Sequence, residues 1–527
     1  MRQRLYLSLV CLFYVPLVFS QQPDVVSQSV IGANNEDTTR VVINTSDGGQ
    51  LIAGYSRSNI SGDKTENSLG SYDYWVLKLD SNGAIQWQNT IGGDSEEEVL
   101  AALETPDGGY IIGGNSRSNA SGDKSEDHMG GVWDYWIVKL DSNGMVVWEN
   151  TIGTEETEHF TSLALASDGG YIVSGMSSGG ISGDKTDHSW GSDDYWILKL
   201  NLSGDIVWQK TIGGNMADAF PVVKATSDGG YILGGHSGSG ISGNKTEPHI
   251  GYIDYWVVKI DVNGNVQWDN TIGGTRHDNL FDLMETSNGG YLIGGYSDSD
   301  ISADKTENSQ GTHDYWVLKL NANGAIVWQN TIGGEGIDRL TRIAEDENGN
   351  YFIAGYSESN TSGDKTEDSR GLLDYWLVKL APHGAIQWDK TIGGSEHDFL
   401  FSIAFSEDNT IRLGGGSYSG VSGDKDVPSH GGTDIWLVNL NNLLEVNDTG
   451  LNSSIGLYPN PTQDVLFISS EEEIQETKIF TVKGDLIQTV VTDDTFRSID
   501  VSGLPNGVYF LQITSEGKTA TKQFIKE

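Results

Sequence analysis

The sequence predicts an all-β chain, in which a seven-bladed β-propeller with four-stranded blades is followed by a small Ig-like β-sandwich. A unit of 60 or 61 residues recurs seven times, as fixed periods do in propellers and solenoids; its Ile-Gly steps begin at Ile31, Ile91, Ile152, Ile212, Ile272, Ile332 and Ile392. Glycine is abundant, with 68 residues beside 15 Trp and 21 Tyr, which is typical of many turns between short strands. The repeats show no helical periodicity.

Each repeat reads as four strands joined by alternating short and long connections. The second repeat illustrates the strands, which we expect over Val99–Glu104, Tyr110–Gly114, Asp134–Leu140 and Met145–Ile152. Asp-Gly-Gly at 107–109 and Asp-Ser-Asn-Gly at 141–144 stand where tight hairpin turns require positive φ. Four antiparallel strands per repeat, seven times over, predict a propeller.

The two ends of the repeat region predict that the ring is closed. The seventh repeat runs from its third strand, Asp434–Leu440, into Asn441-Asn442 and lacks a fourth strand. Val25–Ile31 near the N-terminus aligns with the fourth strand of the second repeat, with Ser27 in the place of the tryptophan. The N-terminal strand should therefore complete the last blade and remove two exposed sheet edges.

The flanking segments divide the chain further. Arg2, Arg4 and the apolar stretch Leu5–Phe19 predict a signal peptide over 1–20, with cleavage before Gln21. We expect the propeller over 24–441, a polar linker over 442–454 and a second domain over 455–527. Cys11 is the single cysteine, so the mature chain has no disulfide. No later stretch is apolar enough to span a membrane, and we expect a monomer.

The charge of the chain excludes whole classes of partner. Lys and Arg total 32 against 74 Asp and Glu, which gives a formal charge of −42. Such a chain repels phosphate backbones and anionic membrane surfaces, so we exclude nucleic-acid binding.

Recurrent acids mark the face on which the second and fourth connections of each repeat emerge. Long loops on a rigid scaffold are the usual place for function, so this long-loop face is the candidate binding surface. If the first strand is innermost, one acid per repeat lines a mouth of the central channel and could hold calcium, which takes six to eight oxygen ligands: Asp37, Glu97, Glu158, Asp218, Asp278, Asp338 and Asp398. No other cofactor is expected. In the alternative interpretation each carboxylate accepts backbone N–H bonds within its own turn.

A second set of acids lies in the Ser-Gly-Asp-Lys loop that forms the second connection. Each is followed by a lysine that offers it a local charge partner: Asp63, Asp123, Asp184, Asn244, Asp304, Asp364 and Asp424. Thirteen of the tryptophans are repeat landmarks and are interpreted as packing between blades. Trp133 and Trp190 lie outside the repeat pattern and are candidates for stacking on a ligand.

Catalytic signatures are weak throughout. The nucleophile-elbow letters at 175–179 are the third repeat's version of an ordinary strand end, and the ten histidines scatter along the chain without a His-Glu-x-x-His motif. We therefore expect no catalytic residues and no enzymatic activity.

The C-terminal segment carries three motifs in order. Tyr458-Pro459-Asn460-Pro461 opens it, Gly507-Val508-Tyr509 follows within Leu-Pro-Asn-Gly-Val-Tyr-Phe-Leu, and Lys522, Phe524 and Lys526 close it. The segment resembles the type A C-terminal sorting domain of the type IX secretion system of Bacteroidetes. The resemblance implies that the secretion machinery is a partner, that the protein crosses the periplasm to the outer cell surface, and that this domain is removed before attachment or release.

The repeats themselves resemble bacterial β-propeller repeats of the Asp-x-(Trp/Phe)-(Val/Leu)-x-Lys-Leu-Asp-x-x-Gly type, which implies a fold but no activity. We therefore expect a secreted or surface-displayed, non-catalytic binding or adhesion module with a surface glycan or protein as ligand. Seven similar loops would gain avidity if one ligand spans them. The alternatives are a secreted polysaccharide-active enzyme and a purely structural surface component.

Overall fold

The computed structural model describes residues 22–406, 410–441, 456–458, 461–481, 486–515 and 518–526. The predicted signal peptide over 1–20 and the predicted linker over 442–454 lie outside these ranges. The chain divides into two compact units between Asn442 and Leu443. All regular structure in the described ranges is β, and they contain no helix able to span a bilayer.

The N-terminal unit consists of seven sheets, and every repeat contributes strands of nearly the same length. The first strands are β2 (Asp37–Asn44), β6 (Glu97–Glu104), β10 (Glu158–Leu165), β14 (Asp218–Ala225), β18 (Asp278–Glu285), β22 (Asp338–Glu345) and β26 (Asp398–Phe405). The second strands are β3 (Gln50–Ser56), β7 (Tyr110–Ser116), β11 (Tyr171–Ser177), β15 (Tyr231–Ser237), β19 (Tyr291–Ser297), β23 (Tyr351–Ser357) and β27 (Thr410–Ser417).

The outer half of each sheet follows the same scheme. The third strands are β4 (Asp73–Leu79), β8 (Asp134–Leu140), β12 (Asp194–Leu200), β16 (Asp254–Ile260), β20 (Asp314–Leu320), β24 (Asp374–Leu380) and β28 (Asp434–Asn441). The fourth strands are β5 (Ile85–Ile91), β9 (Val146–Ile152), β13 (Ile206–Ile212), β17 (Val266–Ile272), β21 (Ile326–Ile332), β25 (Ile386–Ile392) and β1 (Val25–Ile31).

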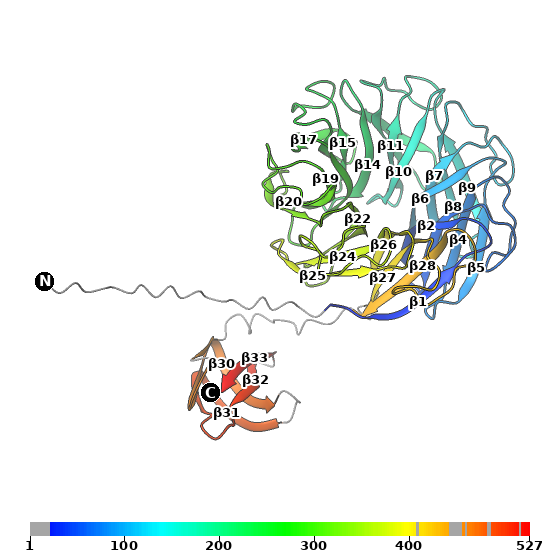
Figure 1. Cartoon of the computed structure of the whole chain (residues 1–527). Coiled ribbons are helices and arrows are strands. Elements are labelled where there is room, and N and C mark those ends of the chain that lie inside the picture. The colour runs from blue at the N-terminus through cyan, green and yellow to red at the C-terminus, as the bar shows by residue number, and fades with distance from the viewer. Residues whose placement is uncertain are drawn as a thin grey trace. The chain divides into compact units, whose positions relative to one another are not determined.

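The predicted ring closure is confirmed. Six sheets consist of four consecutive strands, beginning with β2-β3-β4-β5, whereas the seventh has the order β1-β28-β27-β26. The antiparallel register pairs Ile31 with Ile435 and Val25 with Leu440. The sheets stand side by side around a centre, with β1 beside β28 where the two ends of the repeat region meet (Figure 1). The N-terminal unit is therefore a seven-bladed propeller.

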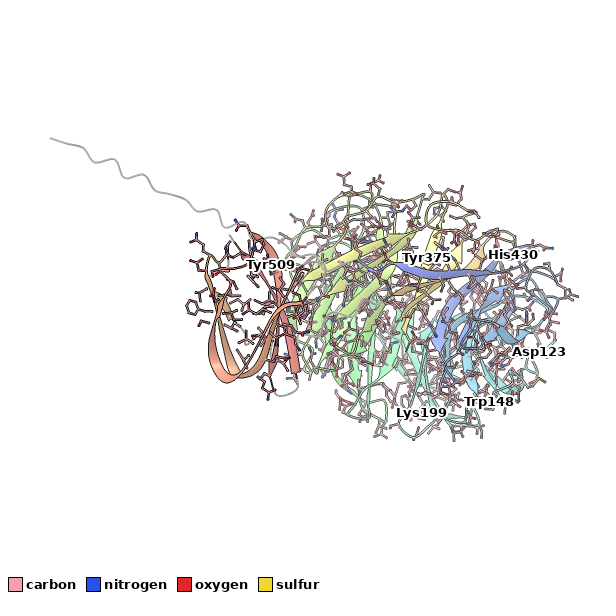
Figure 2. All side chains as sticks on the ribbon, turned by 90° about the horizontal axis from the view of Figure 1, so that it is seen from below. Asp123, Trp148, Lys199, Tyr375, His430 and Tyr509 are labelled. Atoms are coloured by element: carbon pink, nitrogen blue, oxygen red, sulfur yellow. The ribbon has the colours of Figure 1, made fainter. Side chains whose placement is uncertain are left out.

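Adjacent blades are held together by aromatic side chains of the third strand. The seven tryptophans of this strand are all fully buried. In six interfaces a tyrosine ring packs against the tryptophan of the next blade, with centroids 4.8–5.3 Å apart. The Tyr375 hydroxyl also donates a hydrogen bond of 3.1 Å to the backbone carbonyl of Trp436 (Tyr375 is labelled in Figure 2). At the closing interface Ile435 takes the tyrosine's place and packs in a cluster with Trp75.

The tryptophans of the fourth strand reach the next blade at a hairpin turn. Trp87 donates from its indole nitrogen to the carbonyl of Ser142 at 3.2 Å. Its ring occupies the space beside Gly144, where a Cβ atom would lie 2.7 Å from the indole. Gly144 also has φ +82°, which other residues adopt only with strain. These contacts support the interpretation that the repeated tryptophans pack between blades.

The C-terminal unit is a small β-domain whose strands share one hydrogen-bonded sheet. The strands are β29 (Gly456–Tyr458), β30 (Val465–Thr481), β31 (Leu486–Asp500), β32 (Gly507–Ser515) and β33 (Lys518–Lys526). The long strand β30 pairs with β29, β31 and β32, so all five strands are connected. The buried core of the unit includes Leu466, Ile479, Leu511 and Phe524.

Candidate functional site: the mouth of the central channel

The first strands of all seven blades line the central channel. A cavity of about 440 Å³, here called the channel cavity, is bordered by residues from β2, β6, β10, β14, β18, β22 and β26. The first strand is therefore innermost, as expected. Each of these strands begins at the long-loop face. The backbone N–H of its first residue donates to the carbonyl of the residue that precedes a third strand. For example, the Asp37 N–H donates to the Thr433 carbonyl at 2.7 Å.

A β-bulge interrupts every first strand near this face. In six blades the pairing with the second strand skips one residue, and in the fourth blade it skips Phe220 and Pro221. Bulges turn a side chain out of the regular alternation and are frequent beside functional sites. We call the following residues the bulge ring: Arg40, Leu100, Thr161, Phe220, Phe281, Thr341 and Phe401. All seven line a second cavity of about 380 Å³, here called the mouth cavity.

The repeats differ from one another in the residues of the bulge ring. Neighbouring positions that hold the blades together are nearly identical in every repeat, including the first-strand acid and the Asp-Tyr-Trp run. The ring, in contrast, contains one Arg, one Leu, two Thr and three Phe. These residues are not among the site residues predicted from the sequence. The available signal was the divergence among the repeats just after the first-strand acid, at the third residue in six repeats and at Phe220, the second residue, in the fourth.

Arg40 lines three cavities. It borders the channel cavity, the mouth cavity and a third cavity of about 420 Å³, here called the side cavity, which lies where the ring closes. Its guanidinium carbon lies 4.3 Å from the Phe401 ring centroid and 5.8 Å from that of Tyr55. Nη2 donates to the Tyr55 hydroxyl at 3.3 Å. Nε of Arg40 is buried and has no hydrogen-bond partner among the described residues.

The side cavity exists because the seventh blade carries a glycine. Gly416 occupies the position at which the first and sixth blades carry Tyr55 and Tyr356, and both tyrosines line the same cavity. A Cβ on Gly416 would lie 2.9 Å from the Thr38 hydroxyl, so a larger side chain would intrude there. Tyr72 also lines this cavity, and burial raises its pKa to about 12.

Charged groups of both signs face the channel. Arg342 borders the channel and mouth cavities, and its Nη1 donates to the Thr341 carbonyl at 2.7 Å. Desolvation lowers the pKa of Arg342. Asp282 pairs with Lys224 at 3.7 Å and accepts the backbone N–H of Ile343 at 3.0 Å.

Aromatic side chains stand in groups around the mouth. Phe281 stacks on Tyr296 with centroids 5.5 Å apart, and Phe399 stacks on Phe401 at 6.1 Å. Phe220 packs against His236 at 5.4 Å, and its backbone has φ +54°, which is unfavourable for a bulky residue. Burial lowers the pKa of His236 to about 4. Strained backbone of this kind is concentrated at functional sites.

The seven acids predicted as a calcium ring stand at the first residue of each first strand and are fully buried. Each accepts the backbone N–H of the residue four positions earlier at 2.6–2.8 Å. Burial raises the pKa of Asp278 and of Asp338 to about 6. The described residues hold no group of three or more His, Cys, Asp or Glu arranged for a metal ion. Calcium binding stays a prediction, and these bonds favour the alternative of a carboxylate that closes its own loop.

The acids of the Ser-Gly-Asp-Lys loop also bond within the scaffold. Asp63 accepts the N–H of Gly32 at 3.1 Å, and Asn244 fulfils the same role towards Gly213 at 3.2 Å, so the position does not need a charge. The adjacent lysine was expected to pair with this acid, and no such pair occurs within 4 Å in the described ranges. Six of the seven lysines instead lie 5.3–5.9 Å from a third-strand tryptophan ring. Burial lowers the pKa of Lys64 to about 8.

The two tryptophans singled out as stacking candidates do not line the three cavities. Trp190 is 56% exposed and lies beside Gly243 of the following long loop, where a Cβ atom would lie 2.9 Å from the indole. The ring centroid of Trp133 lies 5.0 Å from the guanidinium carbon of Arg117.

In the C-terminal unit, two of the three sorting motifs pair with one another. Gly507, Val508 and Tyr509 in β32 face Lys526, Ile525 and Phe524 in β33. The Tyr509 ring stacks on Phe524 with centroids 5.5 Å apart, and its hydroxyl donates to the Pro505 carbonyl at 2.8 Å. Tyr458 ends β29, Pro461 is exposed and Lys522 lies in β33. Pro459 and Asn460 lie outside the described residues.

Comparison with known proteins identifies this unit. Residues 456–527 match the family model of the secretion system C-terminal sorting domain. A regulatory protein from Caulobacter vibrioides, FlaEY, is 23% identical over 332 residues, which is 58% of this chain and 34% of that protein. The chain thus spans about a third of the length of this curated relative.

Solved structures with a similar course of the chain have low sequence identity to it. PorZ of Porphyromonas gingivalis, an essential bacterial surface component of the type IX secretion system, is 12% identical, with coverage of 94% of this chain and 60% of that chain and a TM-score of 0.40. A fungal alcohol oxidase of the AA5 family, in complex with copper, is 13% identical, with coverage of 96% and 99% and a TM-score of 0.44. The C-terminal unit of this chain is a type IX secretion sorting domain, and the chain is a propeller-bearing component exported to the outer cell surface.

Proposed function

We propose that the protein is a non-catalytic binding or adhesion component, and that its ligand enters the long-loop mouth of the propeller channel. The observation that supports this proposal is the bulge ring. Seven bulges present seven side chains to one cavity, and those side chains differ although the scaffold around them repeats. A purely structural ring would not need unlike residues at equivalent positions.

The long loops supply a second feature of the same face. The residue before each Ser-Gly-Asp-Lys segment is an exposed β-branched apolar side chain in five blades: Ile60, Ile181, Ile241, Ile301 and Val421. Exposed apolar groups arranged around a rim are typical of interaction surfaces. A large ligand seated in the mouth would also contact this rim, which is consistent with adhesion to a polymer or a surface protein.

A glycan array probed with the full chain, in calcium and again in chelator, tests the proposal. We expect binding to a subset of glycans that disappears in a variant carrying Arg40→Ala and Phe401→Ala. The matched control is Arg276→Ala, which removes an exposed side chain outside the three cavities and should leave binding unchanged. Binding that survives in the double variant would place the ligand elsewhere, and silence of the wild type would favour a protein ligand or a structural role.

One observation favours a second candidate, a polysaccharide-active enzyme. Two carboxylates without counterparts in most repeats border the mouth, Glu36 in the side cavity and Glu98 in the mouth cavity. Desolvation raises the pKa of Glu98, as a general acid at neutral pH requires. Release of reducing ends from a bound polysaccharide, abolished by Glu98→Gln with binding retained, would support this candidate. Binding without turnover would contradict it.

A further inference from the structure

We infer that the ligand of the channel mouth is an acidic saccharide, whose carboxylate binds to Arg40 and Arg342 while its sugar rings pack on the surrounding aromatic side chains. This inference rests on the proposed function and specifies its ligand class. It follows from the placement of arginine, the free hydrogen-bonding capacity of one guanidinium, the balance of charge in the mouth cavity and the exposure of the aromatic rings.

Arginine is distributed differently from lysine in this propeller. Thirteen lysines occupy two repeat positions, where they pack on tryptophan or pair with a turn, as Lys78 does with Asp47 at 2.9 Å. No arginine occupies either position. Five of the eight propeller arginines follow or belong to strands at the long-loop face: Arg40, Arg57, Arg117, Arg339 and Arg342. Of these five, Arg40 and Arg342 line the mouth cavity, whereas Arg57 and Arg117 pair with Glu36 and Glu96.

Arg40 is arranged to receive a carboxylate. The Phe401 ring at 4.3 Å and the Tyr55 hydroxyl at 3.3 Å hold the guanidinium in place, yet no carboxylate of the described residues forms an ion pair with it. Its buried Nε has no partner. A planar guanidinium offers parallel N–H donors that match the two oxygens of a carboxylate, and such bonds are among the strong ones in proteins.

The charge balance of the mouth cavity favours an anion. Arg40, Arg342 and Glu98 are the residues lining it that carry formal charge. The cavity therefore has at least one excess positive charge, and more when Glu98 is protonated. Asp282 lies in the channel cavity, where it interacts electrostatically with Arg342 but also pairs with Lys224, so it offsets the charge of Arg342 only in part. A ligand carboxylate would compensate the excess charge.

The rest of the opening suits a sugar better than a peptide or an aliphatic acid. Phe281 is 38% exposed and Phe220 is 47% exposed, so both rings offer an open apolar face at the mouth. The C–H face of a pyranose packs on such rings while its hydroxyls remain free. Thr161, Thr341 and Tyr356 line the same cavity; the two threonine hydroxyls already donate to backbone carbonyls and keep lone pairs that can accept from sugar hydroxyls.

Calorimetric titration of the full chain with four probes tests the inference. The probes are a galacturonic acid tetrasaccharide, the same tetrasaccharide with its carboxyls reduced, a sulfated galactose tetrasaccharide and tetraglutamate. We expect binding of the uronate alone, weakened about 10-fold or more by Arg40→Gln and by Arg342→Gln, since a charge-assisted hydrogen bond is lost. Arg276→Gln removes the same charge from an exposed site outside the three cavities and should leave the affinity unchanged.

The possible results separate the inference from the function on which it rests. Equal binding of the reduced tetrasaccharide, or full affinity in a folded Arg40→Gln variant, would overturn the acidic ligand and leave the binding function standing. Tighter binding of tetraglutamate or of the sulfated probe would overturn the uronate assignment. Failure of the wild type to bind any saccharide would overturn the saccharide ligand and would favour a protein ligand or a structural role. If Arg40→Gln does not fold, Arg40→Lys keeps the charge without the planar donors and should still bind several-fold more weakly.

Discussion

Replacing Asp338 with asparagine should stabilise the propeller at pH 8. The carboxylate is fully buried at the start of β22 and accepts hydrogen bonds from the Gly334 N–H at 2.7 Å and the Ser359 hydroxyl at 3.0 Å. An asparagine oxygen can accept both bonds. The substitution therefore removes the unfavourable burial of a charge, together with its repulsion from Asp314, while the loop stays closed.

The magnitude follows from the pKa. Burial raises the pKa of Asp338 from its usual 3.8 to about 6, so ionisation destabilises the folded state by up to about 3 kcal/mol at pH 8. Because the folded pKa is the higher one, the folded state gains stability as the pH falls through about 6, and the stability is lost again as the pH rises. The advantage of Asp338→Asn should therefore be about half as large at pH 5 as at pH 8.

Thermal melting of the full chain at pH 5 and pH 8 measures this effect. At about 1–2 °C per kcal/mol for a unit of this size, the Tm of Asp338→Asn should rise by up to about 6 °C at pH 8. Glu335→Gln is the control, because it removes an equal charge from an exposed side chain of the same loop. Asp338→Ala should lower the Tm, since two buried donors lose their acceptor. If asparagine lowers the Tm as much as alanine does, the ionised carboxylate is required, and the calcium interpretation gains support.

Three further predictions concern other parts of the chain. Millimolar calcium and chelator should give equal Tm values, since the first-strand acids already accept bonds from their own loops; a calcium-dependent rise would contradict this. Gly144→Ala should destabilise the propeller by about 1–3 kcal/mol, because its Cβ would collide with Trp87 and its φ is +82°; denaturant unfolding would show a lower midpoint. Deleting 455–527 should leave a folded propeller in the periplasm, and normal surface display of that truncated chain would refute the sorting role.

The fold could be predicted because the same local sequence pattern occurs in all seven repeats. Tight turns, an alternation of β-branched and aromatic residues and a constant period determine a four-stranded blade, and the aligned Val25–Ile31 segment reveals the closure. Ser27 stands where other blades carry tryptophan, yet the strand still pairs with β28. Pairing depends mainly on the backbone and the strand pattern, so a single exchanged side chain does not prevent it.

The site could not be read from the sequence in the same way. A bulge is a mismatch between two paired strands, and it leaves no fixed residue type behind. Arg40 and Phe401 come together only because blades one and seven meet at the closure. The loop lysines were expected to pair with the adjacent aspartates. Instead, the loop places the Lys64 ammonium group over the Trp75 ring, where it is largely buried. Such a contact depends on how the loop packs and not on which residues are neighbours in the sequence.

The measurement that tests the account most directly compares two variants of the full chain for adhesion to isolated outer-surface polysaccharide. One carries Arg40→Ala and Phe281→Ala in the bulge ring, and the other carries Ile60→Ser and Ile301→Ser on the loop rim. If the channel mouth holds the ligand, the bulge-ring variant loses adhesion and the rim variant keeps most of it. Loss only in the rim variant would show that the repeated loops, and not the channel mouth, form the binding surface.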